Sequence, residues 1–258
     1  MRKLIALLLI SSNLLAVGGA PPTQSTRDGG NDSALSKALP GNTTAGQKIV
    51  VFVGQDDTGW TMASGPSNSC GDTFTEVSGS PLTGTGLRVR AYVAETAGGC
   101  ATITMTSSVS APYDIYIGEY DNLATTGLIN CTATGTGTST ALTTSNCTTT
   151  ETDTTLVSFG FTDASNATFT AGSGYTIEQQ GGGTNHSGAA QDKNVTATGS
   201  YTGDMTSDTS GNWASFVIGL KNATQSGGGG GGSTGSITTT SGTGSITTTA
   251  GTGSITFR

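Results

Sequence analysis

The segment from residue 87 to residue 93 reads Leu87-Arg88-Val89-Arg90-Ala91-Tyr92-Val93, with an aliphatic side chain at every second position. Successive side chains of a β-strand point to opposite faces of a sheet, so this alternation predicts a strand with one apolar and one polar face. Clusters of Gly, Asn, Asp, Ser and Pro separate such segments, and no stretch after residue 20 has helical spacing. The other predicted strands are 48–54, 102–106, 114–117, 157–161 and 214–220.

Strands that are apolar on one face bury that face when two sheets pack together. The expected fold class is therefore all-β, a two-sheet antiparallel β-sandwich of the jelly-roll or immunoglobulin-like type. The segment 47–222, which contains all these strands, is long enough to bury a sizeable core as one domain.

The N-terminus predicts export. A basic start, Met1-Arg2-Lys3, precedes an apolar stretch over residues 4–17 and the small residues Gly18-Gly19-Ala20. This pattern is typical of a signal peptide over residues 1–20, cleaved after Ala20. A retained membrane anchor is the alternative, but the apolar stretch is shorter than the roughly 20 residues of a spanning helix. We expect a secreted chain without stable membrane insertion, located outside the cell or at its surface.

Three further segments flank the predicted domain. Segment 21–46 is rich in Pro, Gly, Asp and Ser, with isolated Leu35 and Leu39, and is interpreted as a linker that orders only against a partner. Segment 223–233 is a Gly-rich linker, and segment 234–258 carries nine-residue Ile/Thr repeats. These repeats could stay disordered, stack as a short solenoid, or add as strands to a neighbouring sheet edge.

The charge balance excludes one class of partner. The formal net charge is −7, and loss of Arg2 and Lys3 with the signal peptide leaves 8 basic against 17 acidic residues, a charge of −9. Nucleic acids and anionic lipids require a basic surface, so neither is an expected partner. Self-association, other surface proteins or glycans remain as partner classes.

The four cysteines predict disulfides. Cys70, Cys100, Cys131 and Cys147 are even in number and lack the Cys-x-x-Cys or Cys/His spacing of a zinc site. Four cysteines allow three connectivities. We favour Cys70 with Cys100 and Cys131 with Cys147, because each bridge would then join consecutive strands.

The central region also resembles secreted β-sandwich modules of environmental bacteria that occur in large surface proteins beside immunoglobulin-like repeats. The resemblance implies a noncatalytic extracellular module, covers nearly the whole predicted domain and does not include the cysteines. It rests on a series of short motifs in order: Asp72-Thr73-Phe74-Thr75, the segment 82–89, Ala111-Pro112-Tyr113, Ile117-Gly118-Glu119-Tyr120, the segment 168–175, Asp192-Lys193, the segment 197–201 and Ser210-Gly211-Asn212-Trp213.

Two enzyme interpretations are possible and neither is favoured. His186, the single histidine, precedes Ser187 in a Gly-rich segment without a nucleophile-elbow motif, so a solvated loop histidine is expected. Glu119 and Asp121 are spaced to share one strand face, as the carboxylates of laminarinase-like glycosidases are, but a further essential carboxylate is missing after them. The expectation is a chain that is not an enzyme.

Binding sites are weaker predictions. Arg88, Arg90 and Tyr92, or Tyr116 with Tyr120, would form an outward face on which rings stack against a sugar. No cofactor is expected, although Asp56, Asp57 and Asp72 offer oxygen ligands for calcium without the spacing of an EF-hand. Eight Asn-x-Ser/Thr sequons could carry N-linked glycans: Asn31, Asn42, Asn130, Asn146, Asn166, Asn185, Asn194 and Asn222.

Together these features predict a secreted, disulfide-bonded β-sandwich with a structural or adhesive role at the cell surface or in the extracellular matrix. Strand addition through its ends would make it a filament subunit. The alternative is a lectin-like carbohydrate-binding module, and a glycoside-active enzyme ranks below both.

Overall fold

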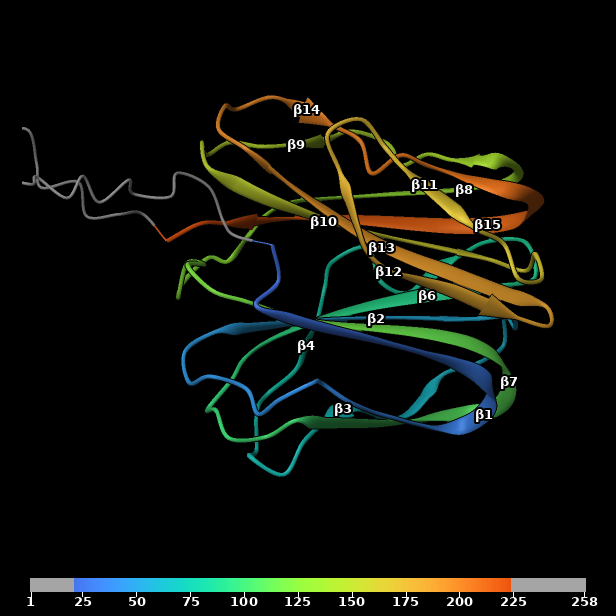
Figure 1. Ribbon diagram of the computed structural model, residues 1–258, viewed down its shortest axis with the longest axis horizontal. Helices are drawn as coiled ribbons and strands as arrows, with labels where there is room; N and C mark the ends of the chain where they lie inside the picture. The colour runs from blue at the N-terminus through green and yellow to red at the C-terminus, as the bar shows by residue number, and fades with distance from the viewer. Residues whose placement is uncertain (1–20, 224–258) are drawn as a thin grey trace, which may run out of the picture. The chain divides into compact units, whose positions relative to one another are not determined.

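The computed structural model describes residues 21–223, so the predicted signal peptide, the glycine tract and the Ile/Thr repeats lie outside the described residues. In the described part every regular element is a β-strand, and no helix occurs. Two antiparallel sheets pack against each other (Figure 1). The predicted all-β sandwich is confirmed.

The first sheet uses only residues 24–120, which we call the first lobe. Its main path runs β1-β7-β2-β6-β4, with β3 paired to β7 and β5 paired to β6. Its strands are β1 (Gln24–Ala38), β2 (Lys48–Gln55), β3 (Met62–Ser67), β4 (Thr75–Glu76), β5 (Leu82–Thr83), β6 (Arg88–Glu95) and β7 (Thr102–Tyr120).

The second sheet uses only residues 129–221, the second lobe. Its main path runs β11-β15-β10-β13-β12, with β8 paired to β15, and a separate small sheet joins β9 to β14. Its strands are β8 (Ile129–Leu142), β9 (Cys147–Thr148), β10 (Thr154–Thr162), β11 (Phe169–Ala171), β12 (Thr176–Gly183), β13 (His186–Val195), β14 (Ser200–Tyr201) and β15 (Met205–Lys221).

The two lobes follow one plan. In each lobe the first strand pairs with the last, the last with the second main strand, and the second with the penultimate long strand: β1-β7-β2-β6 and β8-β15-β10-β13. The Asp56 amide donates to Pro112 at 2.8 Å in the first lobe, as the Asp163 amide donates to Asn212 at 3.1 Å in the second. Met105-Thr106-Ser107 recurs as Met205-Thr206-Ser207. These matches show that the two lobes share a strand order and several local details.

A large bulge recurs at equivalent places. Residues 107–110 of β7 lie opposite the single residue Ser33 of β1, and residues 207–210 of β15 lie opposite Thr140 of β8. Extra residues on one strand bend a sheet. In the first lobe the early part of β7 therefore folds over the outer face of its own sheet, and brings Ile103 and Met105 into the same cluster as Ile115 and Ile117.

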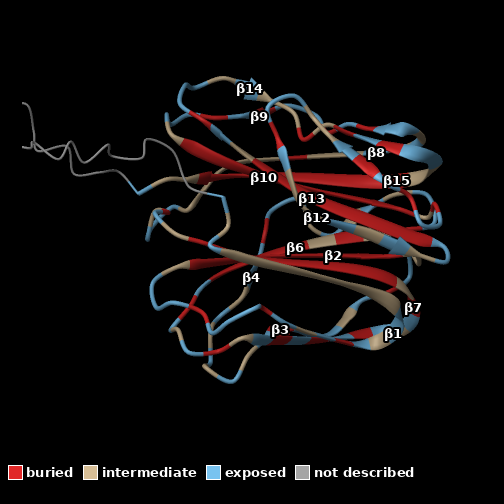
Figure 2. Ribbon diagram, in the orientation of Figure 1, coloured by how far each residue is buried: buried red, intermediate tan, exposed pale blue. Residues whose placement is uncertain are grey.

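The main core lies between the two sheets, where Figure 2 shows the buried strands facing each other. Central β2 reads Lys-Ile-Val-Val-Phe-Val-Gly-Gln and is buried throughout because both of its faces are covered. Val50 and Phe52 face the second sheet, whereas Ile49, Val51 and Val53 face the folded-over outer layer. A strand covered on both faces reads as a continuous apolar run rather than an alternation.

The prediction of a linker over residues 21–46 is wrong, because residues 24–38 form β1. The strand pairs with β7 along its length, and its Leu35 packs in the outer core of the first lobe. The polar composition of β1 reflects its place at the sheet edge, where one side of the strand meets no neighbouring ladder. The sandwich therefore begins before residue 47.

Candidate functional site

The predicted sugar-stacking face does not exist as an outward surface. Tyr116 and Tyr120 are each 1 % exposed and belong to the core between the sheets, where their hydroxyls hydrogen-bond to each other at 2.9 Å. The prediction failed because the polar-looking face of β7 is covered by the second sheet. The two tyrosines are interior residues.

The other half of that prediction, on β6, is also part of the internal packing. Tyr92 is buried in the outer core of the first lobe. Arg90 lies over the ring of Trp60 at 5.2 Å and pairs with Glu76 at 2.7 Å, while Arg88 donates to the Trp60 carbonyl at 2.6 Å. Both arginines hold the segment around Trp60 against the sheet.

Two further tyrosines, near the outer face of the second sheet, also contact other residues of the chain. The Lys193 ammonium lies 4.1 Å from the ring centroid of Tyr175 and 5.4 Å from that of Tyr201. The Tyr175 hydroxyl donates to the Thr202 carbonyl at 2.8 Å, and that of Tyr201 donates to Ala197 at 2.8 Å. The two rings thus bind a cation of the chain itself.

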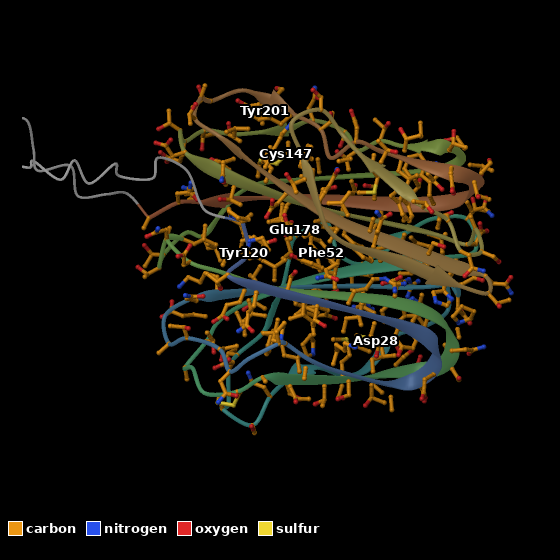
Figure 3. The ribbon with its side chains drawn as sticks, in the orientation of Figure 1. Asp28, Phe52, Tyr120, Cys147, Glu178 and Tyr201 are labelled. Atoms are coloured by element: carbon orange, nitrogen blue, oxygen red, sulfur yellow. A yellow bond between two sulfur atoms is a disulfide. The ribbon has the colours of Figure 1, made fainter. Side chains whose placement is uncertain are left out.

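The most distinctive polar cluster lies where β1 and β7 of the first sheet approach β12 and β13 of the second. We call it the polar seam and define it by Arg27, Asp114, Glu178, His186 and Asp192. Figure 3 places Glu178, with Tyr120 and Phe52, at the level where the two layers meet. The sequence prediction assigned no role to four of these residues and expected His186 in a solvated loop.

Asp114 is the most deeply buried acid of the seam, at 0 % exposure. Arg27 donates to its Oδ2 through Nε at 3.0 Å and also through Nη2, so the pair spans β1 and β7. Burial raises the pKa of Asp114, while the charge of Arg27 acts in the opposite direction. The carboxyl also lies over Gly188 of the second lobe, where an added Cβ would come within 2.9 Å of Oδ2.

Glu178 and Asp192 form a pair of carboxyl groups. Glu178 is the extra residue of a β-bulge between Ile177 and Gln179, and a bulge changes the direction in which a side chain points. Burial, together with the charge of Glu178, raises the pKa of Asp192 to about 8. Oδ2 of Asp192 is buried and accepts no hydrogen bond within the described residues. Burial and the charge of a second carboxyl both favour the protonated form of Asp192.

His186 is buried at 5 % exposure and is the first residue of β13, so the expected solvated loop histidine is wrong. Its Nδ1 lies 3.1 Å from the Thr184 carbonyl, and a Cβ on Gly29 would come within 3.0 Å of Nε2. Burial lowers the pKa of the imidazole. Ser187 donates instead to the backbone carbonyls of Ala164 and His186, at 2.8 and 2.7 Å. The ring fits over a glycine of β1 as a neutral packing group.

The Glu119 carboxylate is also used internally. It is buried, accepts a hydrogen bond from the Gln24 side chain, and accepts one from the Thr44 amide at 2.6 Å. Asp121 has an Oδ1 atom that is buried without a hydrogen-bond partner in the described residues. Glu119 therefore anchors the start of β1 and the loop that follows this strand.

The three candidate calcium ligands are not brought together. Asp56 follows β2 at the end where Gln55 pairs with Arg88, whereas Asp72 lies beside Glu95, at the opposite end of β6. Asp72 accepts hydrogen bonds from Asn68 at 2.7 Å and from the Ala97 amide at 2.7 Å. Across residues 21–223, no group of three or more His, Cys, Asp and Glu side chains is arranged to hold a metal ion.

Both favoured disulfides are present. Cys70 bonds to Cys100 with a Cα–Cα distance of 5.9 Å, and Cys131 bonds to Cys147 at 5.3 Å. The first joins two loops of the first lobe. The second fastens the chain after β8 back onto that edge strand, where the Ser145 amide also donates to the Thr134 carbonyl.

The sequons divide into two groups. Asn130 and Asn222 are half-buried, and their side chains hydrogen-bond to Thr154 and Thr155 respectively, each at 2.8 Å. The other six asparagines are exposed: Asn31, Asn42, Asn146, Asn166, Asn185 and Asn194. Asn166 and Asn185 have positive φ values, 52° and 62°, as turn residues do.

Comparison with known protein families, with curated proteins and with solved structures found no match for this chain. Between residues 21 and 223 there is no helix that could cross a membrane. The polar seam, the disulfides and the two-lobe plan are thus the observations on which a function must be argued.

Proposed function

We propose that this chain is a noncatalytic structural or adhesive module, exported to the cell surface or extracellular matrix, and that it associates with further copies of itself. The observation behind the proposal is that polar and aromatic side chains of the domain contact other parts of the same domain. Arg27, Arg90, Tyr116, Glu119 and Lys193 each contact another part of the same domain. These contacts stabilise a scaffold.

Two features support an extracellular setting. Structural disulfides persist in oxidising compartments and are rare in the cytosol, and the domain has one in each lobe. Solubility rests on hydroxyl and amide side chains, since charged residues make up only 10 % of the chain. The proposed secretion, and the resemblance to bacterial surface modules, agree with both features.

Self-association is proposed through strand addition. The segment 234–258 has three Ile/Thr units, none of which can bury a face alone. Its most direct acceptor is a sheet edge of another copy, and β1 lies at the edge of the first sheet. The disulfide-fastened segment after β8 covers part of the corresponding edge in the second lobe.

The test is mass measurement and electron microscopy of the purified mature chain, combined with a glycan array. Ordered fibres that disappear when Ile237, Ile246 and Ile255 are replaced by Asp support assembly by strand addition. A monomer that is retained on the array supports the carbohydrate-binding alternative. Glycoside cleavage that is abolished by Glu119→Gln would overturn the noncatalytic proposal.

A further inference from the structure

The bonds that give each lobe its shape lie within that lobe. All strand ladders of the described sheets join residues of one lobe, and so do both disulfides. The four ion pairs among residues 21–223 follow the same division: Arg27–Asp114, Lys48–Glu95 and Arg90–Glu76 lie in the first lobe, and Lys221–Glu151 lies in the second. Separating the two lobes therefore breaks no ladder and no covalent bond.

Each lobe also has apolar clusters of its own. The outer core of the first lobe gathers residues between Leu35 and Ile117 around Trp60. The second lobe has two such clusters, one around Trp213 and Phe169 and one around Leu156 and Val217. The core between the sheets is thus an addition to lobes that each bury apolar side chains independently.

The surface between the lobes is mainly apolar. Phe52 of the first lobe stacks on Phe159 of the second, with ring centroids 5.4 Å apart and planes 8° from parallel, and it lies 6.1 Å from Phe216. A polar contact between the lobes lies beside the polar seam, where Gln179 donates to the Ser25 hydroxyl at 3.0 Å. Such a face, separated from its partner, resembles half of an obligate interface.

A single connection, residues 121–128, joins the lobes. It lies along the end of the second lobe, because the Ala124 amide donates to the Lys221 carbonyl at 2.9 Å and the Lys221 amide donates to Leu128 at 2.8 Å. Thr125, Thr126 and Gly127 are exposed at its turn. These three residues belong to no strand, so a change of direction confined to them leaves both sheets intact.

We propose that the inner faces of the lobes form an exchange interface, in which the first lobe of one copy packs on the second lobe of another. Every contact of the closed sandwich is rebuilt in the exchanged form, so the two differ mainly in the connection. Reciprocal exchange closes a dimer, and head-to-tail exchange continues into a filament. The inference rests on the proposed self-association and adds a surface that is separate from the Ile/Thr repeats.

Concentration decides between the closed and the exchanged forms. A short connection holds its own lobe at an effective concentration on the order of millimolar, so dilute chains stay closed. Exchange becomes favourable when the chain concentration approaches this effective concentration. It also becomes favourable when the connection is too short for the two lobes of one chain to pack together. Both conditions can be imposed experimentally.

The first experiment is complementation between two mature full-length variants. Phe52→Asp introduces a charge into the apolar inner face of the first lobe, and Phe159→Asp does so in the second. Neither variant alone can form an intact interface between the lobes. When the two variants are mixed, unfolded and refolded with their disulfides intact, they are expected to give a particle of twice the single-chain mass that contains both chains.

The matched control mixes Phe52→Asp with Val50→Asp. Both substitutions lie in the first lobe, so these two variants cannot complement each other. A mixture that behaves as the sum of its two components overturns the proposal.

A second variant, deletion of residues 125–127 in the wild-type chain, does not depend on a spoiled core. Its mass should at least double while its β-sheet circular dichroism is kept, whereas insertion of Gly-Ser-Gly after Thr125 should leave a monomer. A shortened chain that stays monomeric, or that loses its β-sheet signal, contradicts lobe exchange. Fibres that form equally in the control mixture would support strand addition without lobe exchange, and complementation without fibres would show the reverse.

Discussion

The buried carboxyl group of Asp192 makes the stability of the fold depend on pH. It is 6 % exposed and faces Glu178, and among residues 21–223 no cation contributes to its pKa. Tyr120 and Tyr116 of β7 face the pair across the core, while the Arg27 charge is taken by Asp114. Ionising both carboxyls would place two negative charges in a region of low dielectric constant.

We therefore expect the free energy of unfolding to fall as pH rises. The pKa of Asp192 is raised from 3.8 to about 8, so the folded chain keeps a proton that the unfolded chain has released. Stabilisation by that proton is complete below about pH 4 and is lost as pH rises towards about 8, with a slope of up to about 1.4 kcal/mol per pH unit. Urea denaturation between pH 5 and pH 8 measures the slope.

Asp192→Asn should reduce that slope, because an amide has no proton to lose in this range. The slope that remains belongs to Asp114, because burial raises its pKa to about 8 as well. The matched control is Asp208→Asn, at an exposed acid whose pKa is lowered by hydrogen bonds from Thr168. This control should leave the slope between pH 5 and pH 8 unchanged. Equal slopes in the wild type and in Asp192→Asn would show that the carboxyl pair does not hold the proton.

The Arg27–Asp114 pair gives a second prediction. Arg27→Met leaves the Asp114 carboxyl buried without its partner and should cost about 3 to 5 kcal/mol of stability. Adding Asp114→Asn removes the buried charge and should restore part of the loss. Chemical denaturation of the two single variants and the double variant measures the coupling. Additive losses would mean that the two side chains do not stabilise each other.

The buried position of Asp114 can be predicted in part from the sequence. Asp114 directly precedes the apolar Ile115 and Ile117, and a lone acid beside such a run indicates a buried partner. That partner, Arg27, is 87 residues away in a segment too polar to predict as a strand. The prediction that Tyr116 and Tyr120 lie on an outward face was wrong. Alternation of apolar and polar residues distinguishes the two faces of a strand, but it does not indicate whether both faces are covered.

At the scale of elements, β1 is the clearest departure from expectation. Its backbone pairs with β7, and its polar side chains suit an edge, so composition alone suggested a linker. Strands β8, β12 and β13 were missed for a related reason. They are rich in Thr, Gly, Ser and Ala, with few large apolar side chains to mark a period of two. Small residues fit there because neighbouring groups approach closely, as Asp114 does at Gly188.

The role of β1 can be measured with two substitutions in the same strand. Leu35 is 1 % exposed in the outer core, so Leu35→Ala should cost about 2 to 5 kcal/mol of stability. Lys37→Ala, two residues further and half-buried at the edge, should change stability by less than about 0.5 kcal/mol. Thermal and urea unfolding give both values. Equal, negligible effects would mean that residues 24–38 behave as a linker.

At the scale of the whole molecule, the central feature is the division of one sandwich into two similar lobes. The sequence predicted two packed sheets, because six segments had an apolar period of two or a compact apolar run. It did not indicate that each sheet is contiguous in the chain, since β-pairing depends on register and neighbours that composition does not encode. The repeat becomes visible only when the two strand orders are compared.

The positions of the chain ends bear on assembly. The Thr23 amide donates to the Glu119 carbonyl, and the Ala223 amide donates to the Asn122 carbonyl, so both ends of the described chain lie at one end of the sandwich. The last described residue, Ala223, lies beside the connection between the lobes. Strand addition and lobe exchange would thus both start from the same region of the molecule.

The most direct test of the account is the mass of the purified mature chain, measured by light scattering across a concentration series and followed by electron microscopy. The account predicts a closed monomer when dilute and ordered assemblies when concentrated, with unchanged β-sheet circular dichroism. A chain that remains a monomer at every concentration, while it binds or cleaves a glycan, would contradict it.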